Sequence, residues 1–171
     1  MSSISIIGGA DGPTSIFLAG KIGFDFGWLN LLGLILVVLL LVPNIIYAVK
    51  AKNQHNQCTN KAMNLLEQIG RYGSMFFLVF HIGIAELGFG SVESFLLDLA
   101  GSAVLLIAYW VVWMLYFSKP SYQKQMALAI LPTCLFLLNG VAMRNYLLIL
   151  FSVIFGIGHL YVTNKNTEVP K

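Results

Sequence analysis

The chain has 171 residues, of which 58% are hydrophobic and 10% are charged. An average soluble domain carries about 25% charged residues, so this composition excludes an ordinary soluble domain and indicates an integral membrane protein. The length suits one compact bundle, which we expect in the inner or plasma membrane of a bacterial cell. The net charge of +3 does not indicate nucleic-acid binding, because the basic residues are not interleaved with aromatic ones as a single-strand-binding surface requires.

Residues 1–27 form a glycine-rich first segment, in which one acid, Asp11, lies among glycines and hydroxyl groups. A helix over residues 4–19 would be about 24 Å long, which is shorter than the roughly 30 Å core of a bilayer. We therefore expect the segment to lie at the outer interface or to enter the membrane as a re-entrant loop. No basic region precedes it, so we expect no cleaved signal peptide.

The backbone around Asp11 is expected to depart from regular structure. Glycine adopts conformations that other residues avoid and proline removes a backbone donor, so a helix through Asp11 to Thr14 has to break. The residues that permit or fix this break are Gly8, Gly9, Gly12 and Pro13. A broken element exposes carbonyl groups to a cation, and within a membrane it persists only where protein or water covers it. The pattern predicts an ion-binding turn.

Five apolar stretches follow, each close to the roughly 20 residues that a spanning helix needs. They cover residues 28–49, 72–88, 95–117, 126–143 and 146–162. We predict an all-α integral membrane protein with about five transmembrane helices, the fourth and fifth forming a tight hairpin. Residues 63–71 are either an interfacial helix or an extension of the second span, because apolar residues recur there at helical spacing. Residues 163–171 form a cytoplasmic tail.

The basic residues predict the orientation of these spans. Most of them follow the first, third or fifth span and so fall on one side of the membrane: Lys50, Lys52, Lys61, Arg71, Lys119, Lys124, Lys165 and Lys171. Only Lys21 and Arg144 fall on the other side. The positive-inside rule therefore places the N-terminus outside and the C-terminus in the cytoplasm.

Ionisable groups at membrane depth are costly, so each of them is a functional candidate. His81 and Glu86 fall in the second predicted span, about 140° apart around a helix, and therefore do not form one local site. Asp98 and Ser102 share a face of the third span, and His159 lies in the fifth. Paired carboxylates, zinc-ligand spacings and serine-hydrolase spacings are not found, so we expect no self-contained catalytic centre and no metal beyond a sodium ion.

Residues 8–19, Gly-Gly-Ala-Asp-Gly-Pro-Thr-Ser-Ile-Phe-Leu-Ala, resemble almost letter for letter the signature of the beta subunit of sodium-translocating decarboxylases. In that family the membrane subunit couples the decarboxylation of carboxybiotin, delivered by a partner subunit, to outward sodium movement. The resemblance implies that Asp11 is a cation ligand and that Thr14 and Ser15 contribute hydroxyl oxygens. It also implies that biotin acts on this chain only through a partner subunit.

Two functions remain open at this point. The first is sodium binding or translocation at Asp11, which needs a scaffold to move against and therefore implies a homo-oligomer or decarboxylase subunits as partners. The second is a stand-alone, non-enzymatic membrane protein that uses the motif for packing or for contact with a partner. The second would explain why the chain lacks the other polar element of the decarboxylase family, while the motif itself favours the first. Both functions have the lipid bilayer as a partner.

Overall fold

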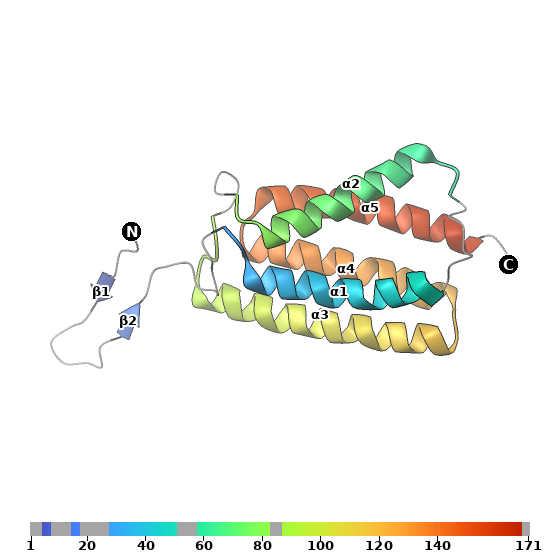
Figure 1. Cartoon of the computed structure of the whole chain (residues 1–171). Helices are drawn as coiled ribbons and strands as arrows, with labels where there is room; N and C mark the ends of the chain where they lie inside the picture. Colours follow the sequence, from blue (N-terminus) through green and yellow to red (C-terminus); the bar gives the residue numbers. More distant parts are fainter. Residues whose placement is uncertain (1–4, 8–14, 18–27, 51–57, 83–86, 169–171) are drawn as a thin grey trace.

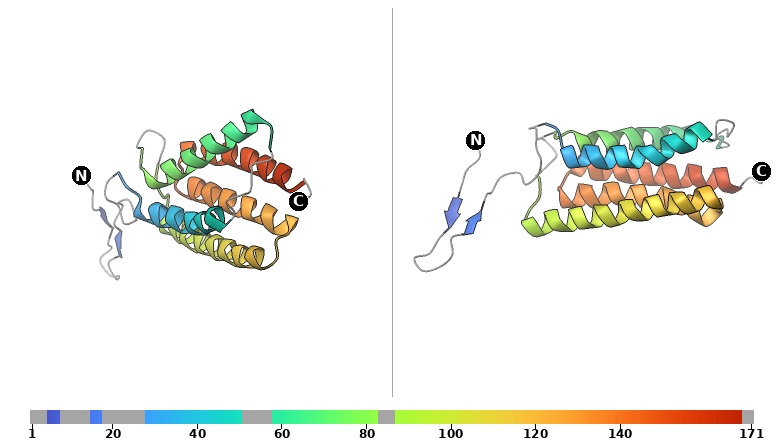
Figure 2. Two further views of the ribbon diagram at one scale, coloured as in Figure 1. Left: turned by 45° about the vertical axis from the view of Figure 1, so that its right-hand side comes forward. Right: turned by 60° about the horizontal axis from the view of Figure 1, so that its bottom comes forward.

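A computed structural model of the chain describes residues 5–7, 15–17, 28–50, 58–82 and 87–168. Its body is a bundle of five helices that lie side by side (Figures 1 and 2). The helices are α1 (Leu31–Lys50), α2 (Lys61–Val79), α3 (Val92–Ser118), α4 (Tyr122–Ala142) and α5 (Tyr146–Glu168). Four helices are long and apolar enough to cross a membrane, namely α1, α3, α4 and residues 146–166 of α5. The predicted helical architecture is confirmed, and it is compatible with an integral membrane protein.

Two short strands flank the glycine-rich motif, where we had expected a broken helix. Strands β1 (Ser5–Ile7) and β2 (Ser15–Phe17) pair in antiparallel register, with Ile6 opposite Ile16. Isoleucine and phenylalanine favour strands, and Gly and Pro residues between two such runs are a turn signal. The two strands were not predicted, and Asp11 and the rest of residues 8–14 lie outside the described residues.

The second predicted span, residues 72–88, does not match a helix of the structure. Helix α2 begins eleven residues earlier, where the Asn60 side chain accepts hydrogen bonds from Ala62 N and Met63 N, and it ends at Val79. The chain then turns extended, because its next backbone groups pair with the segment before α1: Val79 O accepts from Asn30 N at 2.7 Å, and His81 N donates to Trp28 O at 2.9 Å. Residues 63–71 are thus part of a longer helix, which places Arg71 inside α2 and not in a loop.

The other predicted spans agree with the observed helices within a few residues. Helices α4 and α5 form the predicted hairpin, joined by a three-residue turn in which Arg144 has a φ of 50°. The Asn145 side chain fastens this turn: its Oδ1 accepts from Leu148 N at 2.9 Å, and its Nδ2 donates to Phe77 O of α2 at 3.3 Å. The start of α5 is thereby tied to the end of α2.

Glycines allow α2 and α5 to pack with their backbones close together. A Cβ atom placed on Gly70 would lie 2.3 Å from the backbone N of Phe155, and one on Gly158 would lie 2.6 Å from the backbone N of Glu67. Small residues permit such contacts between membrane helices. The two pairs also fix the register, because they bring Glu67 of α2 to the level of α5 that holds His159.

Proline interrupts the hydrogen bonding of α1, and α3 compensates for it. Pro43 has no N–H for the carbonyl of Leu39, four residues earlier. Trp110 Nε1 of α3 donates to that carbonyl at 3.2 Å. One residue further, the carbonyl of Leu40 accepts from the Asn44 side chain at 2.9 Å. A polar face of α1 therefore turns toward α3 in the middle of an apolar helix.

Candidate functional site: a polar cleft in the bundle

Charged side chains meet inside the bundle where α2 packs against α5. Glu67 is 5% exposed, and its Oε1 accepts hydrogen bonds from both Arg71 of the same helix and His159 of α5, whose Nδ1 lies 2.9 Å away. The His159 ring stacks on Phe155, with ring centroids 4.7 Å apart and planes inclined by 17°. A buried carboxylate is costly unless it is paired and hydrogen-bonded, and this arrangement satisfies one of its two oxygens.

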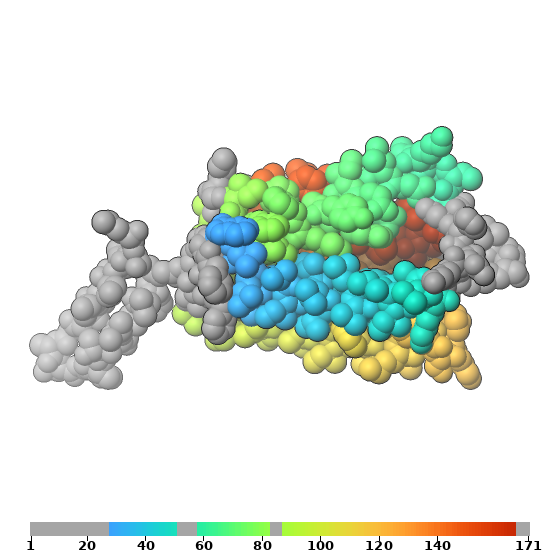
Figure 3. Space-filling view, in the orientation of Figure 1, coloured from blue at the N-terminus to red at the C-terminus, as the bar shows by residue number. Residues whose placement is uncertain are grey.

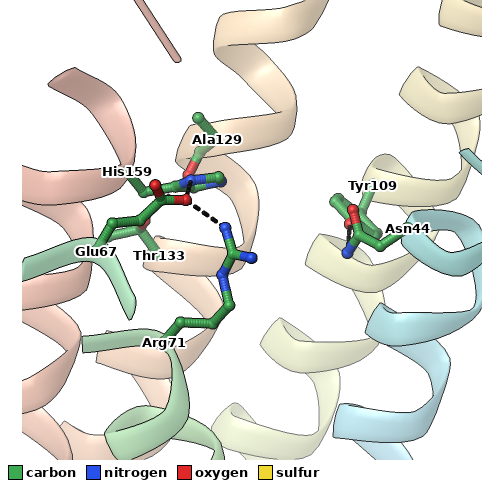
Figure 4. A network of polar contacts seen from close by, with 7 residues as sticks. All are labelled: Asn44, Glu67, Arg71, Tyr109, Ala129, Thr133 and His159. Atoms are coloured by element: carbon green, nitrogen blue, oxygen red, sulfur yellow. Dashed lines mark hydrogen bonds and ion pairs between the residues drawn. The ribbon is translucent and has the colours of Figure 1, made fainter. Parts of the chain in front are cut away.

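A second, uncharged polar group faces this cluster from α1 and α3. Asn44 Nδ2 donates to the Tyr109 hydroxyl at 2.8 Å, and that hydroxyl lies 3.4 Å from Leu40 O. Figure 4 shows the two groups, with the guanidinium of Arg71 lying between them in this view. Arg71 and Tyr109 are close enough to interact electrostatically.

The protein surface is hollowed in this part of the bundle. In the space-filling view the surface is hollowed between the N-terminal half of α2 and the C-terminal half of α1, and α5 is visible at the floor (Figure 3). The Arg71 side chain is 33% exposed, whereas that of Glu67 is 7% exposed. We call this hollow, with Asn44, Glu67, Arg71, Tyr109 and His159, the polar cleft. It combines both signs of charge with hydrogen-bonding groups on its walls.

The structure brings only one of the sequence-predicted polar candidates to the polar cleft. That residue is His159. His81, expected in the middle of a span, lies beyond the end of α2. Glu86 and the motif residues Asp11 and Thr14 lie outside the described residues, and Ser15 is in β2 without a described side chain.

The remaining candidates lie together on the α3–α4 interface. Asp98 and Ser102 are 7% and 3% exposed, and the Ser102 hydroxyl accepts from Asn139 Nδ2 of α4 at 2.8 Å. Asp98 Oδ1 is buried without a hydrogen-bond partner among the described residues. This interface contains one carboxylate, which is fewer than a divalent cation normally requires. It is separate from the polar cleft.

Sequence analysis missed Glu67, Arg71 and Asn44 as site residues. Arg71 was used only to predict the orientation, because the second span was placed too late in the chain. Asn44 follows Pro43 within an apolar run, and a polar side chain directly after an intramembrane proline is a signal for a local polar contact. Their meeting with His159 depends on tertiary packing.

The described residues do not include a cluster of three or more His, Cys, Asp and Glu that could hold a metal ion. The polar cleft itself supplies one carboxylate beside two cation-forming side chains, which disfavours a bound metal cation there. Its chemistry suits a small polar solute. Comparison with known proteins adds no assignment, since no family model, curated protein or solved structure matches the chain.

Proposed function

We propose that this chain is a stand-alone, multi-pass membrane protein that binds a small polar solute in the polar cleft and has no self-contained catalytic centre. The observation that carries the proposal is the buried Glu67 carboxylate, held by Arg71 and His159 beside a hollow that opens between α1 and α2. Ionisable groups are rarely kept at membrane depth, and where they occur they mark substrate or ion pathways.

The proposal includes α2 as a fifth helix in the bilayer, although its average hydropathy is low. Four of its large side chains form an exposed apolar stripe, Leu65, Ile69, Tyr72 and Phe76, while the polar Glu67 and Ser74 are buried. This is the reverse of a soluble amphipathic helix, and it suits lipid outside and polar contacts inside. Nineteen residues extend about 28 Å, which is close to the bilayer core.

The proposed orientation places the C-terminus in the cytoplasm. Basic residues gather at the end of the bundle where α1 and α5 end and where α3 connects to α4: Lys50, Lys61, Lys119, Lys124 and Lys165. The positive-inside rule assigns this end to the cytoplasm. The polar cleft lies in the half of the bundle nearest this end, so it opens toward the cytoplasmic leaflet.

Cysteine labelling tests both the cleft and its orientation. In a chain whose native Cys58 and Cys134 are replaced by serine, Asn44→Cys is expected to react with a water-soluble, membrane-impermeant thiol reagent added from the cytoplasmic side of inverted vesicles. The matched control is Ile45→Cys, because Ile45 is the next residue of α1 and is exposed on its apolar surface; it is expected to stay unlabelled, since lipid suppresses the thiolate. Absence of labelling at Asn44→Cys from either side would refute a water-filled cleft.

Sodium binding at Asp11 is the second candidate, and the N-terminal motif favours it. The motif's resemblance to sodium-translocating decarboxylases makes Asp11 the cation ligand, with Thr14 and Ser15 as hydroxyl contributors. Such a function needs partner subunits for any decarboxylation. It is compatible with the solute cleft, because the two sites use different residues.

Thermal stability of the purified protein tests the sodium candidate. Sodium, compared with potassium at equal ionic strength, is expected to raise the melting temperature of the wild-type protein, since a ligand that binds only the folded state stabilises it. Asp11→Asn is expected to lose this effect. Asp25→Asn, which removes an acid from the same segment, is expected to keep it. Equal sodium effects in wild type and Asp11→Asn, or none in either, would remove Asp11 from the role.

A further inference from the structure

We propose that the polar cleft recognises an oxyanion, a carboxylate or phosphate group, through the guanidinium of Arg71. This inference deepens the proposed solute-binding function and rests on it. Two observations identify the ligand group. Arg71 has N–H donors without a protein acceptor, and the Glu67 carboxylate is shared between Arg71 and His159.

The guanidinium of Arg71 is underused by the protein. Its side chain makes one hydrogen bond among the described residues, from one terminal nitrogen to Glu67 Oε1. An arginine side chain carries five N–H donors in a planar fork, so an edge of this fork remains for another acceptor. In the view of Figure 4 the guanidinium, which belongs to α2, lies between Glu67 and the pair of Asn44 and Tyr109. A planar fork with paired donors matches the geometry of carboxylates and phosphates.

The Glu67 carboxylate does not occupy all the donors of Arg71. The same oxygen, Oε1, also accepts from His159 at 2.9 Å, so Glu67 is shared between two donors from two helices. The pair with Arg71 is therefore a single contact at one corner of the guanidinium and leaves the bidentate edge open. The cluster is neutral with an uncharged histidine and positive with a charged one, and in neither state does it repel an anion.

The opposite wall offers partners for the rest of such a solute. Asn44 is exposed, and its Nδ2 group is occupied by Leu40 O and the Tyr109 hydroxyl. Its Oδ1 atom has no partner among the described residues, so the wall facing Arg71 presents an acceptor. These positions of donor and acceptor suit a solute that has an oxyanion at one end, to accept from Arg71. At its other end it has a hydrogen-bond donor, such as a hydroxyl or ammonium group, to donate to Asn44 Oδ1.

The phosphate of an anionic lipid headgroup could also bind to Arg71 in place of a soluble oxyanion, because the cleft opens at the side of the bundle. The distinction can be measured with the labelling system described above, in which Asn44→Cys stands opposite Arg71. The probes are an anionic and a cationic methanethiosulfonate reagent, each compared with its rate on a free thiol, and inorganic phosphate as a protecting oxyanion. The vesicles contain phosphatidylcholine alone or with phosphatidylglycerol.

The expected result is a preference for the anionic over the cationic reagent of about tenfold, and slower labelling when phosphate replaces chloride at equal ionic strength. Arg71→Gln is expected to abolish both effects, whereas Arg144→Gln, which removes the same charge at the other end of the bundle, is expected to keep them. Arg71→Lys keeps the charge but loses the planar fork, so the reagent preference is expected to remain while phosphate protection weakens. This third variant keeps the test informative if Arg71→Gln does not fold.

Each outcome separates the inference from the proposed function. Labelling of Asn44→Cys without an anionic preference or phosphate protection would leave the water-filled cleft intact and overturn the oxyanion. Phosphate protection in phosphatidylcholine vesicles supports a soluble ligand. If only phosphatidylglycerol slows the labelling of Asn44→Cys, the oxyanion bound by Arg71 is a lipid headgroup. Protection that persists in Arg71→Gln would overturn the role of Arg71.

Discussion

Glu67 is a buried carboxylate that connects two helices of the bundle, α2 and α5. It accepts from Arg71 and His159 while only 5% of its surface is exposed. Removing one partner of a buried ionic group leaves the other uncompensated, which costs about 3–5 kcal/mol. The carboxylate therefore holds Arg71 and His159 at the contact between α2 and α5.

Close contact of the α2 and α5 backbones makes a residue-scale prediction. Gly70→Ala places a methyl group within 2.3 Å of the backbone of Phe155, so the helices have to separate, and we expect a loss of about 1–3 kcal/mol in unfolding free energy. The measurement is denaturant unfolding in mixed micelles. Gly90→Ala is the matched control, because its nearest neighbour is the flexible Arg144 side chain at 3.5 Å. Equal stability of the two variants would contradict the close packing.

At the scale of elements, α1 and α3 form a pair in which one helix completes the hydrogen bonds of the other. Pro43 leaves the Leu39 carbonyl without its helical donor, and Trp110 supplies one at 3.2 Å. Asn44 and Tyr109 make the adjacent contact at 2.8 Å. Pro43 therefore has two consequences. It leaves a polar face on α1, and it makes α3 the helix that supplies hydrogen bonds to that face.

This pairing predicts a rescue. Trp110→Phe removes the donor to Leu39 O and is expected to destabilise the protein by about 1–2 kcal/mol, the cost of an unsatisfied carbonyl. Pro43→Ala restores a backbone N–H at position 43, so in the Pro43→Ala background the loss caused by Trp110→Phe is expected to be smaller. A double-mutant cycle of unfolding free energies measures the coupling. Strictly additive losses would show that Trp110 acts by packing alone.

For the whole molecule, most of the helical architecture was predictable from the sequence, because α1, α3, α4 and α5 have long apolar runs that hydropathy detects. The second span was placed too late in the sequence, because α2 carries charged and polar side chains in its first half, among them Glu67 and Arg71. The strands β1 and β2 were missed because glycines were interpreted as breaks in a helix. The polar cleft was not predictable, because residues 44, 67, 109 and 159 meet only after the helices pack.

The junction between the start of α1 and the end of α2 has a mechanical consequence. Backbone hydrogen bonds of 2.7 and 2.9 Å, together with Asn30 Nδ2 donating to Leu78 O at 3.1 Å, fasten the two helices at one end. Toward their other ends the same helices diverge (Figure 1). If α1 rotates relative to α2 about this junction, the displacement of α1 grows with distance from the junction. A small rotation of α1 about this joint would therefore change the spacing most at the far end of the pair, where α1 ends and α2 begins.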